Sequence, residues 1–173
     1  TTLGYSMVFK RYAIIDVLVL GGLYTIRVIG GVVVIQSSDA QWLLMFSLFL
    51  FLCLALVKRC SELVQLRERG IADTPGRGYR VSDLAVLQPM AAAAGYGAVL
   101  LSALYVSSNK VARLYEHPKL LWLICPLIMY WISRVLLLSG RGELHDDPVI
   151  FAITDRLSWL TAAAVVAVVL VAT

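Results

Sequence analysis

The chain has 173 residues, of which 60% are hydrophobic, and a formal net charge of +4. Soluble domains contain only about 45–50% apolar residues, so this composition excludes an ordinary soluble domain and predicts an integral membrane protein. No nucleic-acid partner is expected. The three cysteines are scattered and form no CxxC pair, so we expect small buried thiols rather than a disulfide or a metal site.

Five apolar segments are long enough for transmembrane helices, which need about 20 apolar residues. Because backbone groups in lipid must be satisfied within the segment, we expect helices rather than strands. The sequence therefore predicts one all-α domain, a polytopic membrane helix bundle with five transmembrane helices. In chain order the predicted spans cover residues 13–36, 41–57, 87–107, 118–138 and 149–172.

The loops between these spans fall alternately on two sides of the membrane. Most Lys and Arg residues lie on or near the side that receives loops 58–86 and 139–148, whereas Lys110, Arg113 and Lys119 lie near the other side. Positively charged loops stay in the cytoplasm. We therefore expect an integral membrane protein whose longer loops are cytoplasmic and whose C-terminus is outside.

Arg27 lies in the middle of the first predicted span, within LYTIRVIGG. A central Arg costs about 2.5–3.5 kcal/mol on insertion scales and usually faces a bundle interior or an aqueous cavity. Snorkelling would have to bridge roughly 14 Å, which is about nine residues at 1.5 Å per residue. We therefore expect Arg27 to line a polar cavity and to be a further phosphate ligand there.

Charge returns abruptly after the second span, in LALVKRCSELVQLRERG at residues 54–70. If the helix continues beyond the span, Lys58 and Glu62 share one face at i, i+4, and Arg69 extends that face. A solvated helix end with an internal ion pair would account for this pattern and contribute a few tenths of a kcal/mol. The alternative is a phosphate site at the membrane surface, with Lys58, Arg59 and Arg69 as its cations.

A third charged stretch, RGELHDDPVIFAITDRLSW, precedes the last apolar run. Asp147 before Pro148 is typical of an N-cap followed by proline at the first helical position. Asp155 and Arg156 lie two turns further on and must sit near or below the membrane surface if the helix is to span. Ionisable residues there are functional candidates, so Asp155 and Glu62 are the candidate catalytic and metal-binding carboxylates, and Arg156 is a further phosphate ligand.

Three segments carry a resemblance to a known family: FKRYAIIDVLVLGGLYTIRVIGG at 9–31, ALVKRCSELVQLRERG at 55–70 and DDPVIFAITDR at 146–156. Together they resemble the UbiA-type prenyltransferase superfamily, and within it the decaprenyl-phosphate phosphoribosyltransferase-like branch. That branch typically shows a Lys-Arg-Tyr-x-Glu-Leu stretch, in which Cys60 stands here in place of the Tyr. The resemblance implies that the five spans are the last five of a nine-helix bundle.

The same resemblance implies Mg²⁺ as the cofactor and an isoprenoid lipid as a substrate. It assigns Lys58, Arg59 and Glu62 to an active-site element and makes Arg27 and Asp155 line its cavity. The most concrete reaction is attack of a polyprenyl-phosphate oxygen on the anomeric carbon of phosphoribosyl pyrophosphate, with release of pyrophosphate. Two alternatives stay open: prenyl transfer to an aromatic or tetrapyrrole acceptor, and a non-catalytic structural subunit of a larger membrane complex.

The family's first aspartate motif, Asn-Asp-x-x-Asp, does not occur in this sequence. We expect that motif in an N-terminal helical half, supplied on the same chain or by a partner membrane subunit. The segment alone is therefore expected to be inactive. A homo-oligomer or a larger membrane complex is compatible with this interpretation.

Overall fold

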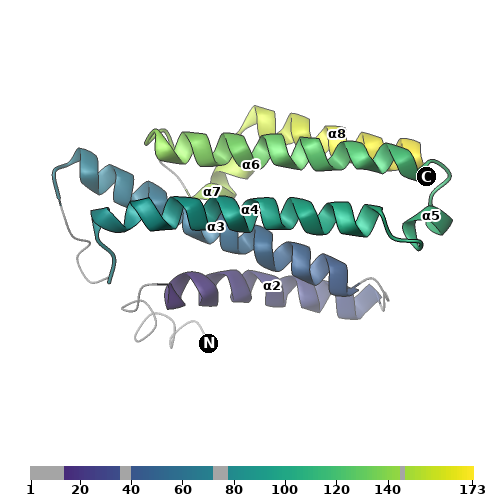
Figure 1. Ribbon diagram of the computed structural model, residues 1–173, viewed down its shortest axis with the longest axis horizontal. Helices are drawn as coiled ribbons and strands as arrows, with labels where there is room; N and C mark the ends of the chain where they lie inside the picture. Colours follow the sequence, from purple (N-terminus) through teal and green to yellow (C-terminus); the bar gives the residue numbers. More distant parts are fainter. Residues whose placement is uncertain (1–13, 36–39, 72–77, 145–146) are drawn as a thin grey trace.

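The computed structural model describes residues 14–35, 40–71, 78–144 and 147–173. Seven α-helices and two short 3₁₀ helices (η) follow one another in these residues, which confirms the all-α class (Figure 1). Their bounds are α2 (Ile15–Ile35), α3 (Ala40–Glu68), η2 (Val81–Asp83), α4 (Leu84–Val106), α5 (Val111–Leu114), η3 (Pro118–Leu123), α6 (Ile124–Gly140), α7 (Pro148–Thr154) and α8 (Arg156–Ala172).

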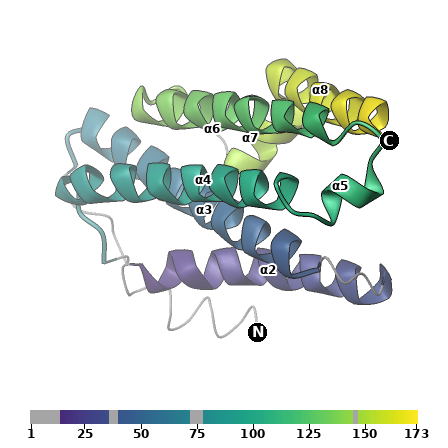
Figure 2. The ribbon, with the colours of Figure 1, turned by 45° about the vertical axis from the view of Figure 1, so that its right-hand side comes forward.

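The long helices lie side by side and alternate in direction (Figures 1 and 2). α3 is the central helix and packs against α2, α4, α6 and α7, while α8 packs against α6 and η3. At the end of the bundle that holds the C-terminus, the N–H of His117 donates to the carbonyl of Ala172 at 3.1 Å. The end of α3, the start of α4 and the end of α6 lie at the opposite end (Figure 1). This arrangement agrees with the predicted alternation of the loops.

Three helices of the described part of the chain are long and apolar enough to cross a membrane. They are Gln41–Glu68, Val81–Val106 and Pro118–Gly140, and α7 with α8 would make a fourth if the bent pair counts as one span. The protein is therefore an integral membrane protein, and the second, third and fourth predicted spans are confirmed as helices. The first predicted span forms α2, a helix of 21 residues.

α3 extends well past the predicted end of its span at residue 57. Its 29 residues correspond to about 44 Å of helix, whereas the hydrocarbon core of a bilayer is about 30 Å thick. The charged stretch after the predicted span is therefore helical, and α3 as a whole is longer than the apolar layer is thick. The side chains of Lys58, Arg59 and Glu62 are thus held on a rigid element.

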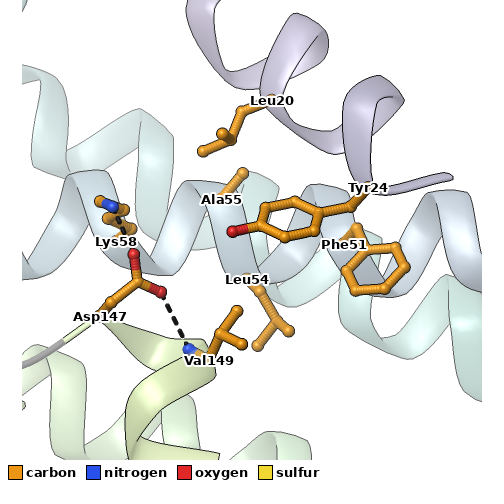
Figure 3. A pocket seen from close by; sticks show the side chains of 8 residues that line it. All are labelled: Leu20, Tyr24, Phe51, Leu54, Ala55, Lys58, Asp147 and Val149. Carbon is orange, nitrogen blue, oxygen red and sulfur yellow. Dashed lines mark hydrogen bonds and ion pairs between the residues drawn. The ribbon is translucent and has the colours of Figure 1, made fainter. Parts of the chain in front are cut away.

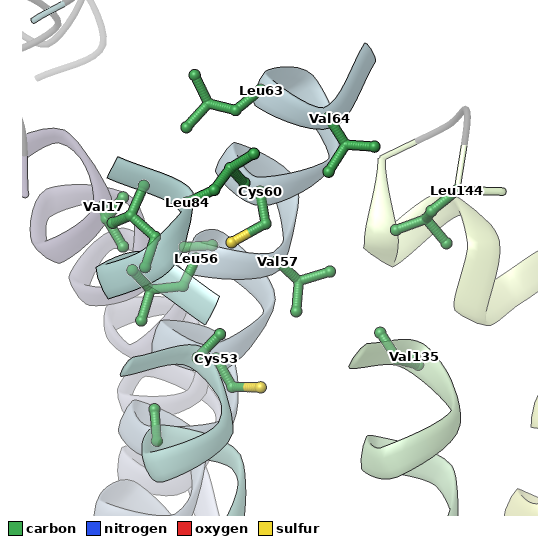
Figure 4. Close-up of a cluster of buried hydrophobic side chains, with 14 of the residues drawn as sticks. Val17, Cys53, Leu56, Val57, Cys60, Leu63, Val64, Leu84, Val135 and Leu144 are labelled. Atoms are coloured by element: carbon green, nitrogen blue, oxygen red, sulfur yellow. The ribbon is translucent and has the colours of Figure 1, made fainter. Parts of the chain in front are cut away.

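The apolar core surrounds the second half of α3 (Figure 4). Cys53 and Cys60 are buried free thiols within this core, as the sequence predicts. The core also reaches α2, α4, α6 and the segment before α7. The residues of this cluster that Figure 4 labels are Val17, Cys53, Leu56, Val57, Cys60, Leu63, Val64, Leu84, Val135 and Leu144.

Gly95 allows α4 to approach both α3 and α6 closely. A Cβ atom at this position would lie 2.6 Å from Cγ2 of Ile132 and 3.0 Å from Sγ of Cys53. Ile132 is only 1% exposed, so its branched side chain has little room to move away. Small residues of this kind let membrane helices pack backbone to backbone.

We expect Gly95→Ala to reduce the free energy of unfolding by about 1–3 kcal/mol, because an added methyl group overpacks this contact. The matched control is Gly22→Ala in α2, where an added Cβ meets nothing within 4 Å; it should be neutral or slightly stabilising. Thermal unfolding midpoints of both variants in the same detergent measure the difference. Equal midpoints would show that α4 moves away from α6 without cost.

The fifth predicted span, residues 149–172, is not one continuous helix, so the prediction was wrong on this point. α7 and α8 are bent by 75° relative to each other, and Asp155 lies at the break with an extended backbone (φ −79°, ψ 126°). Its carboxylate accepts a hydrogen bond from the N–H of Ser158 at 2.8 Å. Asp155 breaks the span because its side chain caps a new helix start.

Candidate functional site

A buried ion-pair network joins α2 to α3. Oδ2 of Asp16 accepts a hydrogen bond from Nε of Arg59 at 2.6 Å, and Oδ1 accepts one from the Tyr79 hydroxyl at 2.6 Å. Nη1 of Arg59 also donates to Oε2 of Glu62 at 2.6 Å. The side chains of Asp16 and Arg59 are 0% and 3% exposed. The side chain of Glu62 is 31% exposed and lies at the edge of this network. We call Asp16, Arg59, Tyr79 and this partly exposed Glu62 the buried cluster.

Tyr79 fixes the segment before η2 to the buried cluster. Its hydroxyl accepts a hydrogen bond from the N–H of Ile14 at 2.6 Å and donates to Asp16. Burial, together with the hydrogen bond to Asp16, raises the pKa of Tyr79 well above its ordinary value, so the phenol stays protonated. The charge of Arg59 is compensated inside the protein, and Arg59 therefore holds α2 and α3 together. Its predicted binding of phosphate stays a prediction.

A narrow cleft lies between α2, α3 and the start of α7 (Figure 3). Lys58 and Asp147 form its polar end, where Nζ of Lys58 pairs with Oδ2 of Asp147. The two side chains are 34% and 24% exposed. We call this the Lys58 cleft. Its apolar walls consist of Leu20, Tyr24, Phe51, Leu54, Ala55 and Val149.

Asp147 has two roles at the start of α7. Oδ2 pairs with Lys58, while Oδ1 accepts a hydrogen bond from the N–H of Val149 at 3.0 Å, which confirms the predicted N-cap before Pro148. Burial alone would raise the pKa of Asp147, but the hydrogen bonds from Lys58 and Val149 and the charge of Lys58 outweigh it and hold that pKa below its ordinary value. Asp147 is therefore a carboxylate at neutral pH.

Asp155 forms a second ion pair, at the other end of α7. Nη1 and Nη2 of Arg134 in α6 donate to its two carboxylate oxygens at 2.6 and 3.0 Å. Asp155 also accepts from the hydroxyl of Ser158, which in turn accepts from Nε1 of Trp131, both at 2.9 Å. The cation that pairs with Asp155 is thus Arg134, from a different helix, and the neighbouring Arg156 is exposed.

The predicted site residues fall into separate groups. Glu62 and Arg59 belong to the buried cluster, Lys58 pairs with Asp147, and Asp155 pairs with Arg134. The remaining three predicted phosphate ligands, Arg27, Arg69 and Arg156, are exposed. The guanidinium of Arg27 lies 5.5 Å from the ring centroid of Tyr24, next to the apolar wall of the Lys58 cleft.

The two carboxylates predicted to bind a metal do not form a metal site on their own. Glu62 and Asp155 each accept hydrogen bonds from an Arg. In the part of the chain that the structure describes, no three His, Cys, Asp or Glu side chains converge to hold a metal ion. Mg²⁺ prefers several oxygen ligands in near-octahedral geometry, so these residues alone do not fit Mg²⁺.

Three residues of these networks were not predicted from the sequence: Asp16, Tyr79 and Arg134. A signal for Asp16 exists, because it is a carboxylate within the apolar run AIIDVLVL, and ionisable residues in spans usually have a partner. Arg134 in WISRVLLL gives the same signal. Tyr79 gives none, since its role depends on where the loop before η2 places it.

The fold and these ion pairs define a membrane helix bundle with charged side chains at one end. No protein-family model matches the chain. It is 36% identical over 164 residues to the uncharacterized protein y4nM of Sinorhizobium fredii, a match that covers 94% of this chain and 32% of y4nM. It is 35% identical over 148 residues to the nodulation protein NoeC of Azorhizobium caulinodans, covering 84% of this chain and 47% of NoeC. The chain therefore spans about a third and about half of the lengths of these two relatives.

Proposed function

We propose that this chain is part of a UbiA-type membrane transferase that binds a polyprenyl phosphate lipid. The observation that carries the proposal is the Lys58 cleft, whose apolar walls lead to a cation at the charged end of the bundle. An isoprenoid chain would lie against the apolar walls, where its burial is favourable. Its phosphate would approach the ammonium group of Lys58, which suits an anionic oxygen.

In the reaction we propose, an oxygen of the polyprenyl phosphate attacks the anomeric carbon of phosphoribosyl pyrophosphate. The new C–O bond forms while the C–O bond to pyrophosphate breaks, and pyrophosphate leaves with that electron pair. Lys58 would offset negative charge on the phosphates. Arg59 would act as a positioning residue, because its contacts with Asp16 and Glu62 fix the turn of α3 that carries Lys58.

Parts of the longer protein would complete this site. Arg27 is exposed on α2, and a central Arg in a membrane span is costly unless protein or water surrounds it. This favours an N-terminal half, or a partner membrane subunit, that covers α2. Ligands for Mg²⁺ would have to come at least partly from there. The charge pattern favours a cytoplasmic position for the Lys58 end in a bacterial membrane, and the similarity to NoeC favours a role in nodulation.

A non-catalytic structural subunit is the second candidate function. The ion pairs Lys58–Asp147, Arg59–Asp16 and Arg134–Asp155 join elements that are distant in the sequence. Such charges neutralise one another without any ligand, as a purely structural role would require. Prenyl transfer to an aromatic acceptor would use the same cleft, with the lipid diphosphate as the donor.

In the full-length protein we expect Lys58→Ala to raise the KM for polyprenyl phosphate about ten- to a hundredfold. The reason is the loss of one charge-assisted hydrogen bond, about 1.5–3 kcal/mol. Lys58→Arg should retain part of the affinity. Lys119→Ala, which removes the same charge from an exposed position in η3, is the matched control and should leave KM unchanged.

The assay compares two substrate pairs: phosphoribosyl pyrophosphate with polyprenyl phosphate, and a prenyl diphosphate with an aromatic acceptor. Turnover of the first pair alone supports the reaction written above. Turnover of the second pair alone favours ordinary prenyl transfer. No turnover of either pair by the full-length protein, together with lipid binding that does not depend on Lys58, favours the structural subunit.

A further inference from the structure

We propose that Asp147 is a built-in competitor for Lys58, which an anionic head group has to displace, and that its displacement releases the start of α7 and opens the Lys58 cleft. This inference rests on the proposed function, because it concerns the same lysine. The ion pair between Lys58 and Asp147 exists before an anionic head group binds.

The anion position beside Lys58 is already filled by a carboxylate. Oδ2 of Asp147 pairs with Nζ of Lys58 at the polar end of the cleft (Figure 3). A phosphate that binds the same ammonium would lie next to this carboxylate, and two like charges at such a distance repel each other. Arg59 does not relieve the conflict, because it is buried and held by Asp16 and Glu62. Asp147 must therefore move when phosphate binds.

The two ends of α7 are held by different numbers of polar contacts. At the Asp147 end, Lys58 contributes one ion pair of half-buried side chains, and Pro148, the first residue of α7, is buried. At the other end Asp155 accepts two hydrogen bonds from Arg134 and two from Ser158. The chain also bends by 75° there. When the Lys58 contact is lost, α7 should therefore move about Asp155 rather than detach as a whole.

The Lys58 cleft has little free space while Asp147 is in place. Its free volume is ≈ 10 Å³, which is about the space of one water molecule. Val149 is part of its wall, and the backbone N–H of Val149 donates a hydrogen bond to the Asp147 carboxylate. Movement of Asp147 would carry Val149 outward and give an isoprenoid chain access to the surfaces of Leu20, Tyr24 and Leu54.

The test is Asp147→Asn in the full-length protein. Asn caps helices about as well as Asp, so α7 should still begin at Pro148, but the charge that competes for Lys58 is gone.

The probes are a polyprenyl phosphate and the phosphodiester lipid phosphatidylglycerol, each titrated into nanodiscs of zwitterionic lipid that contain the protein. Both should bind about tenfold more tightly, which corresponds to the loss of one charge-assisted contact. Asp83→Asn, at the last residue of η2, changes the net charge by the same amount and should leave both affinities unchanged.

Movement of α7 is measured by the rate at which a maleimide labels a single introduced cysteine. Val149→Cys should react slowly without a probe and several times faster with polyprenyl phosphate, whereas Ile153→Cys, exposed and close to Asp155, should not change.

Unchanged or weaker binding by Asp147→Asn would overturn the competitor role, provided that binding by the native protein depends on Lys58. If native binding does not depend on Lys58, the proposed function fails together with this inference.

Discussion

Replacing Asp16 by Asn should destabilise the protein by about 3–5 kcal/mol, because the substitution leaves the buried guanidinium of Arg59 without its principal counter-charge. Asp16 is 0% exposed and Arg59 is 3% exposed, so water cannot take the place of the lost carboxylate. The Tyr79 hydroxyl also loses a charged acceptor. The effect should appear as a large drop in the thermal unfolding midpoint in detergent.

Two further variants test whether the loss of the buried counter-charge causes this destabilisation. The double variant Asp16→Leu with Arg59→Met removes both buried charges and should recover part of the lost stability, since apolar replacement of a buried ion pair is often neutral. The recovery should be incomplete, because Tyr79 loses its contact with Asp16 and Glu62 loses its contact with Arg59. Asp147→Asn removes a carboxylate from a half-exposed pair and should cost less than Asp16→Asn. If Asp16→Asn keeps the native midpoint but abolishes turnover, Asp16 acts on the substrate and is not chiefly a structural residue.

The sequence was sufficient to predict most of the helices, because membrane spans are defined by length and apolar content alone. The helix boundaries were harder where polar residues decide them. α3 continues to Glu68 because nothing in its charged stretch breaks a helix, so the end of the apolar run did not mark the end of the helix. The break at Asp155 depends on a cap and on Arg134, which lies 21 residues away.

The charge pairing was less predictable than the helices. Local spacing suggested a pair between Lys58 and Glu62, one turn apart on α3. Lys58 pairs with Asp147 instead, across 89 residues, and Arg59 pairs with Asp16, across 43. Helical spacing cannot predict such contacts, because they form only when α2 and α7 are placed beside α3.

The burial of these ion pairs decides which cation an incoming phosphate can reach. A charge that is paired inside the protein contributes to ligand binding only after its partner is displaced, and the cost depends on burial. The pair of Lys58 and Asp147 is half-exposed, whereas the pair of Arg59 and Asp16 is buried. An incoming phosphate should therefore open the first pair and leave the second intact, which makes Lys58 the better candidate for contact with substrate.

Asp155 should prove to be a positioning residue whose removal costs about 2–4 kcal/mol of stability. Asp155→Ala loses the bidentate ion pair with Arg134, where a hydrogen bond to a charged group contributes about 1.5–3 kcal/mol. It also loses the cap on α8, which contributes about 1 kcal/mol. Asp155→Asn keeps a capping acceptor and should cost only the ion-pair part of this loss, about 1.5–3 kcal/mol. Arg134→Ala should resemble Asp155→Asn, because it removes the ion pair and leaves the cap in place.

The matched control for Asp155 is Arg156→Ala, because Arg156 is the next residue and is exposed. Surface substitutions of this kind usually change stability by less than about 0.5 kcal/mol. Thermal midpoints and turnover should be measured on the same preparations of full-length protein. If Asp155 is a positioning residue, turnover should fall together with the thermal midpoint, moderately in Asp155→Asn and further in Asp155→Ala. Arg134→Ala should then reduce turnover as well. A catalytic carboxylate predicts the opposite pattern: Asp155→Asn would abolish turnover at a nearly native midpoint, while Arg134→Ala would keep measurable activity.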